Sequence, residues 1–225
     1  MSHLYHSPLI GIVLCCTSYL GGVWLQKKTR SVFCNPVLIA LITCIMTMQV
    51  MGITLEQFYN GASTIQLFLA PATCALALSI YRQRTILRHY FIPVICGCMV
   101  SSFVSIIGSF ILGTLFQLDK VITMSTVPNS VTSAIAIDLA EQLGGIVSIA
   151  ILCVIITGIA GAILSPYLIK IFHITDEVEM GVAIGASSHV IGTSKAVELG
   201  EIQGAMSGVA IGVSGLITVF LTLFL

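Results

Sequence analysis

A strongly apolar stretch at positions 181–204, GVAIGASSHVIGTSKAVELGEIQG, contains polar residues that lipid would not tolerate. The polar side chains fall within positions 187–198 and are Ser187, Ser188, His189, Thr193, Ser194, Lys195 and Glu198. Polar, irregular backbone at membrane depth persists only where it lines a cavity or is buried by neighbouring segments. Ionisable residues at that depth mark functional sites by default. The stretch is therefore a candidate binding site.

Glycines in the same stretch weaken any regular helix through it. Gly181, Gly185 and Gly192 each cost about 1 kcal/mol of helix stability relative to alanine. The sequence therefore predicts a broken or re-entrant helix here.

The composition of the chain shows what surrounds this stretch. Of 225 residues, 57% are hydrophobic and 8% are charged, against roughly 25% charged in soluble proteins. Because a helical span needs about 20 residues, this length predicts roughly seven to nine helical segments. We expect an all-α polytopic membrane protein with one domain over 1–225. Its nine Lys and Arg residues balance nine Asp and Glu, so no nucleic-acid partner is expected beside the lipid bilayer.

Apolar runs and basic loops predict the path of the chain. Long apolar runs occupy residues 9–25, 35–52, 62–81, 91–116, 146–169 and 205–225. The loops at 27–30 and 82–88 are basic, which by the positive-inside rule makes them cytoplasmic and places both termini outside. Pro71, inside the third run, predicts a kink or break, because proline removes a helical hydrogen bond.

A second irregular stretch occupies residues 121–145. A short apolar piece is followed by Pro128-Asn129-Ser130, then by a helix-compatible piece that ends in Asp138, Glu141 and two glycines. Whether 121–145 and 181–204 cross the membrane or re-enter stays open. Interrupted hydrophobic segments in both halves of the chain suggest an inverted repeat, an arrangement that places a transporter's binding site at the interrupted helices.

Residues after Pro128 have the composition of a half-helix N-terminus, which attracts carboxylates and phosphates. The candidate donors are Asn129, Ser130, Thr132 and Ser133. An ordinary capped helix start in a loop is the alternative. Asp138 and Glu141, three residues apart, are either an interfacial helix end or an ionic element coupled to the site.

The stretch at 181–204 would supply the other side of the site. Its candidate ligands are Ser187, Ser188, His189, Thr193 and Lys195. Each has a structural alternative: the hydroxyls bond back to the backbone, His189 stays neutral against a carbonyl, and Lys195 pairs with Glu198 on one helix face.

An enzymatic function is not expected. Ser187, Ser188 and His189 are adjacent in sequence, whereas a nucleophile and its base need hydrogen-bond reach and a third, orienting group. The chain shows no metal-ligand spacing, phosphate loop or dinucleotide fingerprint, so no metal or cofactor is expected. Its eight cysteines lie almost entirely in apolar runs and behave there as small hydrophobes.

Three long motifs resemble one family. VPNSVTSAIAIDLAEQLGGI, VIITGIAGAILSPYLIKI and GVAIGASSHVIGTSKAVELGEIQGAMSGVAIGVSGLITV are similar to the LrgB/CidB (YohK-type, antiholin-like) membrane protein family, related to plant plastidial glycolate/glycerate translocators. The resemblance covers the chain from about residue 35 to its end. It departs at Asn129, where relatives usually carry a lysine after the proline, so the cation that would hold an anion there is absent.

The resemblance implies a multi-pass protein of the inner (plasma) membrane, with a smaller LrgA/CidA-type membrane partner. We also expect a homo-oligomeric assembly. It also implies a secondary transporter of small monocarboxylates of the glycolate, glycerate and pyruvate class. The alternative is an antiholin-like regulator of murein hydrolase export and lysis, in which the same polar residues hold helices or a partner subunit together.

Overall fold

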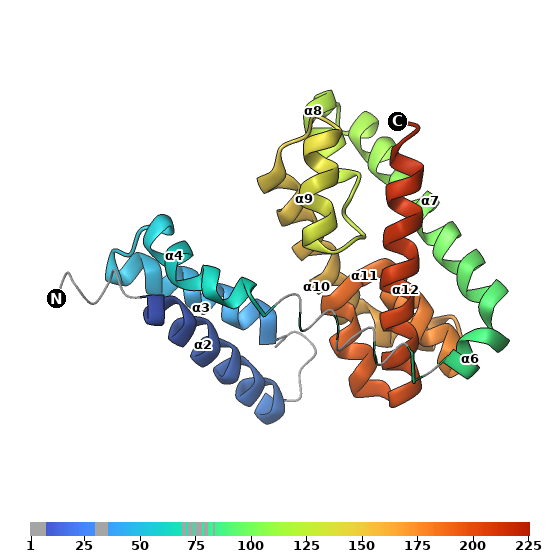
Figure 1. Cartoon of the computed structure of the whole chain (residues 1–225), viewed down its shortest axis with the longest axis horizontal. Helices are drawn as coiled ribbons and strands as arrows, with labels where there is room; N and C mark the ends of the chain where they lie inside the picture. Colours follow the sequence, from blue (N-terminus) through green and yellow to red (C-terminus); the bar gives the residue numbers. More distant parts are fainter. Residues whose placement is uncertain are drawn as a thin grey trace. The chain divides into compact units, whose positions relative to one another are not determined.

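The computed structural model of the chain describes residues 8–29, 36–68, 71, 74, 78, 81–82 and 84–225. Across these described residues the backbone forms ten helices and no strand. This confirms the predicted all-α fold (Figure 1). The chain divides into two compact units, Met1–Leu78 and Ser79–Leu225. The single domain expected over 1–225 stays a prediction.

The first unit contains α2 (Pro8–Thr29), α3 (Pro36–Met51) and α4 (Leu55–Gln66). Helix α3 begins at Pro36, as expected of a residue whose missing N–H falls in the unpaired first turn. Glycines allow close packing around α2: a Cβ at Gly11 would lie 2.6 Å from the Ala62 backbone nitrogen, and one at Gly22 would lie 2.7 Å from the Pro36 carbonyl oxygen.

Helix α4 begins before the apolar run at 62–81 and contains Glu56 and Asn60. The helix starts early because Thr54 and Gln57 form a capping box: the Gln57 N–H donates to Thr54 Oγ1 at 3.3 Å, and the Thr54 N–H donates to Gln57 Oε1 at 3.1 Å. This reciprocal pair satisfies two N–H groups that a helix start leaves unpaired.

The predicted apolar run at 62–81 begins inside α4, which ends at Gln66. Most of the remaining run lies outside the described residues. Pro71 itself is described as helical, but its neighbours Ala70 and Ala72 are not, so the predicted kink there stays a prediction.

The second unit contains α6 (Arg84–His89), α7 (Phe91–Leu115), α8 (Lys120–Thr126), α9 (Ser133–Gln142), α10 (Val147–Ile171), α11 (Glu177–Leu199) and α12 (Glu201–Thr222). In the described residues, three helices are long and apolar enough to cross a membrane: α7, α10 and α12. At 25 residues, α7 extends about 37 Å at 1.5 Å per residue, which exceeds a hydrocarbon core of about 30 Å.

Both predicted interruptions are present in this unit. The α8 helix stops at Thr126 and α9 starts at Ser133, so the segment around Pro128 breaks the helix. The α11 helix continues through 181–199 but has non-helical dihedrals at His189, φ 41° and ψ −142°. The break falls on His189, between Gly185 and Gly192, within the stretch where the glycines predict a weakened helix.

Two apolar clusters form the core of the second unit. The first joins α7, α11 and α12 around Val94, Val182 and Met206. The second joins α9, α10 and the turn before α9, around Val131, Leu139 and Val154. Large apolar side chains of α7 and α10 instead face outward, as expected where lipid replaces water.

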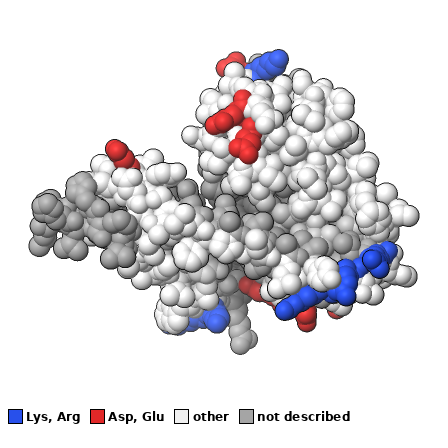
Figure 2. Space-filling view, viewed as in Figure 1, with Lys and Arg blue, Asp and Glu red and all other residues white. Residues whose placement is uncertain are grey.

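Charge is sparse on the surface of this unit. Figure 2 shows the coloured side chains of its visible face in separate groups toward opposite ends, with white surface between them. This distribution fits a helical bundle whose middle lies in the bilayer.

Candidate functional site

The kink in α11 places His189 in the interior of the second unit. Its side chain is 3% exposed, and its Nε2 lies 2.8 Å from the Val154 carbonyl oxygen of α10. Because a carbonyl only accepts, Nε2 is the donor and carries the hydrogen. A positive φ at a non-glycine residue costs of order 1–3 kcal/mol and persists only where the surroundings enforce it.

Glycines of α10 make room for the kinked segment. A Cβ at Gly158 would lie 2.5 Å from His189 Cε1 and 2.8 Å from its Nε2. A Cβ at Gly161 would overlap the Ser188 hydroxyl. Small residues at helix contacts let membrane helices approach closely. Here the missing side chains of Gly158 and Gly161 leave room for the His189 ring and the Ser188 hydroxyl.

Hydroxyl groups satisfy the carbonyls on both sides of the kink. Before it, Ser101 of α7 donates to the Ala186 carbonyl at 3.0 Å. After it, Thr193 donates to the His189 carbonyl at 2.9 Å. Thr193 Oγ1 also lies 2.7 Å from Ser207 Oγ of α12, and since the Thr193 hydrogen is already used, Ser207 is the donor. These bonds supply partners that a broken helix must find elsewhere.

The paired serines before the kink also bond internally. Ser187 donates to the Ala183 carbonyl at 2.7 Å, and Ser188 Oγ lies 3.0 Å from Ser187 Oγ. With the Ser187 hydrogen engaged, Ser188 donates to Ser187. The donors of Ser187, Ser188 and Thr193 are therefore all used within the protein in this conformation. Ser187 and Thr193 bond back to the backbone, as their structural alternative has it, whereas Ser188 bonds to a neighbouring side chain.

The interruption between α8 and α9 contains Asn129, and its amide group bonds to α7. Asn129 Nδ2 donates to Ser109 Oγ at 3.0 Å and to the Thr126 carbonyl at 2.9 Å. Its Oδ1 accepts from Ser105 at 3.1 Å. Both amide hydrogens are thus used, so Asn129 fixes the turn rather than presenting a donor to a ligand.

The N-terminus of α9 is different. Thr132 is the N-cap residue, and no side chain caps the helix. Ser133 and Ala134 are exposed, while Ser130 is buried. The first N–H groups of a helix have no partner within it, so this end keeps donors available for an acceptor.

Val154 connects the two interruptions. Its carbonyl accepts from His189, and its side chain packs in the cluster that includes Val131 and Ala136 at the start of α9. The two predicted binding elements therefore lie against the same turn of α10. That they enclose one cavity stays a prediction. A shallow depression on α7, lined by Phe110, Ile111, Thr114 and Leu115, contains none of the predicted ligands.

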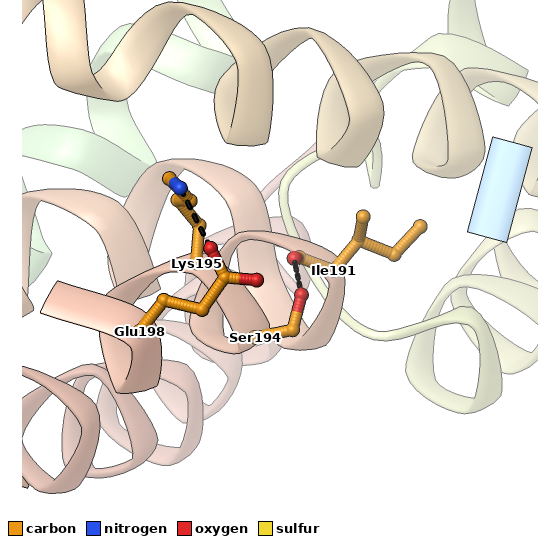
Figure 3. Close-up of polar contacts among 4 residues, drawn as sticks. All are labelled: Ile191, Ser194, Lys195 and Glu198. Carbon is orange, nitrogen blue, oxygen red and sulfur yellow. Dashed lines mark hydrogen bonds and ion pairs between the residues drawn. The ribbon is translucent and has the colours of Figure 1, made fainter. Parts of the chain in front are cut away.

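Lys195 pairs with Glu198 along α11. Lys195 Nζ lies 2.6 Å from Glu198 Oε2, and their side chains are 22% and 47% exposed. In Figure 3 the two side chains meet beside α11, while Ser194 bonds to the Ile191 carbonyl of its own helix. The geometry supports the ion-pair alternative that the sequence left open for Lys195.

Asp138 and Glu141 lie in the second half of α9, and both are exposed. Whether these carboxylates lie at a membrane boundary or act with the site stays a prediction. Across the described residues, no group of three His, Cys, Asp or Glu side chains is arranged to hold a metal ion.

Several polar residues of the second unit were not predicted from the sequence. Ser102 of α7 donates to the Ser214 carbonyl at 3.2 Å, and Thr218 donates to Ser102 Oγ at 3.0 Å. Ser102, Ser105 and Ser109 form a hydroxyl stripe along α7, an otherwise apolar helix. Its spacing of three or four residues places these serines on one helix face and is the sequence signal that could have revealed them.

The fold and this buried hydroxyl network define a polytopic α-helical membrane protein. The sequence profile of the LrgB-like family matches residues 15–225. The antiholin-like protein LrgB of Bacillus subtilis (strain 168) is 31% identical over 214 residues, covering 95% of this chain and 93% of the relative. The antiholin-like LrgB proteins of Bacillus cereus (strain B4264) and Bacillus anthracis (strain CDC 684 / NRRL 3495) show the same identity and coverage. The chain belongs to the LrgB-like family. No solved structure gave a significant match.

Proposed function

We propose that this protein is a secondary transporter of small monocarboxylates in the inner membrane, and that the substrate carboxylate binds at the N-terminus of α9. The supporting observation is that α9 starts at Ser133 and that its N-cap residue, Thr132, makes no side-chain capping bond. Unpaired N–H groups and the positive end of the helix dipole favour an anion at this point.

The proposed ligands are the N–H groups at the start of α9 together with the hydroxyls of Ser130, Thr132 and Ser133. Asn129 supports them by fixing the turn through Ser105 and Ser109. The polar residues of α11 lie on the other side of Val154, where their hydrogen bonds hold the kink at His189. The proposal involves no cofactor and no chemical change in the substrate.

Uptake into proteoliposomes tests this proposal. Purified protein would be assayed with two- and three-carbon monocarboxylates, and with the double variant Thr132→Ala, Ser133→Ala. Hydrogen bonds to charged groups contribute about 1.5–3 kcal/mol, so we expect a rise in KM of roughly tenfold to a hundredfold.

Ser194→Ala is the matched control, because Ser194 is exposed and bonds within its own helix. Saturable uptake that is equal in the double variant and the wild type would contradict the α9 site. Absence of uptake for every acid tested would contradict the transporter itself.

A second candidate function is antiholin-like regulation of murein hydrolase export, with a smaller LrgA/CidA-type membrane partner. It is favoured by the name of the Bacillus relatives and by the internally bonded hydroxyls of α7, α11 and α12, which suit a scaffold. Stable co-purification with such a partner, combined with no carboxylate uptake by either protein, would support this alternative.

A further inference from the structure

Residues 190–199 form a short helical arm between two interruptions of the backbone. The arm begins after His189, whose φ is 41°, and ends at Gly200, whose extended dihedrals separate α11 from α12. We call residues 190–199 the hinged arm. Both of its ends lie at points where the regular helix is already broken, so the arm can rotate without breaking further helical structure.

The hinged arm is held less tightly than the part of α11 before the kink. Before the kink, Val178, Val182 and Ala186 pack in the core with α7 and α12, and a Cβ at Gly185 would lie 2.7 Å from Ser207 Cα. In the hinged arm, Val190 and Val197 are 55% and 61% exposed. The arm buries a stripe formed by Gly192, Thr193 and Ala196, and it approaches α12 closely at one point, where a Cβ at Gly204 would lie 3.0 Å from Val197 Cα.

A few contacts fix the hinge in the observed position. On α10, the Val154 carbonyl accepts from His189, and Gly158 leaves room for the ring. On α7, Ser101 donates to the Ala186 carbonyl just before the kink. The bond between Thr193 and Ser207 then fastens the arm to α12.

We propose that the hinged arm moves about His189, and that Val154, Gly158 and Ser101 are positioning residues that hold it in the observed conformation. Val154 also packs with Val131 and Ala136 at the start of α9. A displacement of His189 therefore shifts the turn of α10 around Val154 and, with it, the N-terminus of α9. Only this last link depends on the proposed carboxylate site; the motion itself does not.

Hydrogen–deuterium exchange of the purified full chain tests the motion without any substrate. Gly158→Ala would place a methyl group 2.5 Å from His189 Cε1 and 2.9 Å from Ile191 Cβ, and would displace both the ring and the first turn of the arm. We expect amide exchange in residues 190–199 to accelerate at least severalfold, while exchange in residues 177–186 stays unchanged. Gly212→Ala is the matched control, because a Cβ at Gly212 meets nothing within 4 Å.

His189→Asn is the second variant, in case Gly158→Ala fails to fold. Asparagine is among the non-glycine residues that adopt positive φ most often, and its side chain is shorter than the imidazole ring, so it removes the contact with the Val154 carbonyl. We expect the same localised acceleration. Exchange rates in the folded variants that match the wild type, or that rise equally across 177–199, would overturn the proposal, because α11 would then behave as one rigid helix. Failure of carboxylate uptake alone would leave these exchange results intact.

Discussion

His189 Nε2 of α11 donates to the Val154 carbonyl of α10 across 2.8 Å. This bond joins a backbone kink to the helix that also supports the start of α9. The neutral ring then has its hydrogen on Nε2, which leaves Nδ1 as the nitrogen able to accept. Val154 contributes to both sides of the site, through its carbonyl to His189 and through its side chain to Val131 and Ala136.

The first prediction concerns this bond. His189→Leu removes the donor, while the Val154 carbonyl keeps its backbone bond within α10, so the variant loses one hydrogen bond, about 0.5–1.5 kcal/mol. We expect a lower thermal unfolding midpoint for the variant in detergent. His173→Leu is the control, since His173 also has a positive φ, 53°, but is exposed. Equal destabilisation by the two substitutions would show that the Val154 contact contributes nothing.

The second prediction concerns Asn129. Asn129→Asp keeps an oxygen for Ser105 but replaces the donor to the Thr126 carbonyl with an acceptor. The variant should lose about 1–3 kcal/mol of unfolding free energy, measured by denaturant titration in detergent. Asn60→Asp, at an exposed position of α4, should change little. A fully stable Asn129→Asp would show that the turn is not held by this amide.

The third prediction compares two glycines. A Cβ at Gly185 would lie 2.7 Å from Ser207 Cα, whereas one at Gly108 meets nothing within 4 Å. Gly185→Ala should therefore destabilise the protein by about 1–3 kcal/mol through overpacking. Gly108→Ala should be neutral or slightly stabilising, because alanine favours helix. Thermal unfolding of both variants checks the packing of α11 on α12, and a Gly185→Ala variant as stable as Gly108→Ala would argue against that contact.

Local chemistry explains which parts of the fold could be predicted. The apolar runs correspond to α2, α3, α7, α10 and α12, because helix formation in lipid depends on composition and length. The break near Pro128 was also predictable from proline's missing N–H. The start of α4 at Leu55 was missed because its signal is the pairing of Thr54 with Gln57, which lies outside the apolar run.

The site was less predictable, because its contacts join residues far apart in sequence. His189 was named as a candidate, yet nothing local to it specifies Val154, 35 positions away. Ser101 bonds across 85 positions and Ser102 across 112. The sequence alone shows that α11 carries polar residues, and so identifies them as candidates. The helix packing decided that most of their donors bond within the protein.

The fourth prediction concerns topology. The basic segments at 27–30 and 82–88, parts of which lie in α2 and α6, should be cytoplasmic, and both termini should be outside, because cytoplasmic segments carry excess Lys and Arg. Alkaline phosphatase fused at Gln26 or Arg84 should be inactive, and a cytoplasmically active reporter at the same positions should be active. Phosphatase activity at either position would reverse the predicted orientation.

The fifth prediction separates the two roles of Lys195, whose Nζ lies 2.6 Å from Glu198 Oε2. If the lysine only pairs with Glu198, Lys195→Met leaves the carboxylate without that partner, and protein yield and uptake should fall together. A partly exposed ion pair contributes about 0–1 kcal/mol in water, whereas an unpaired charge near the bilayer costs more. The double variant Lys195→Met, Glu198→Gln should then recover both properties. If Lys195 instead binds substrate, the single variant folds normally without saturable uptake, and Glu198→Gln cannot restore it. The observed pairing leads us to expect recovery in the double variant; a double variant that is well folded yet inactive would assign Lys195 to the substrate.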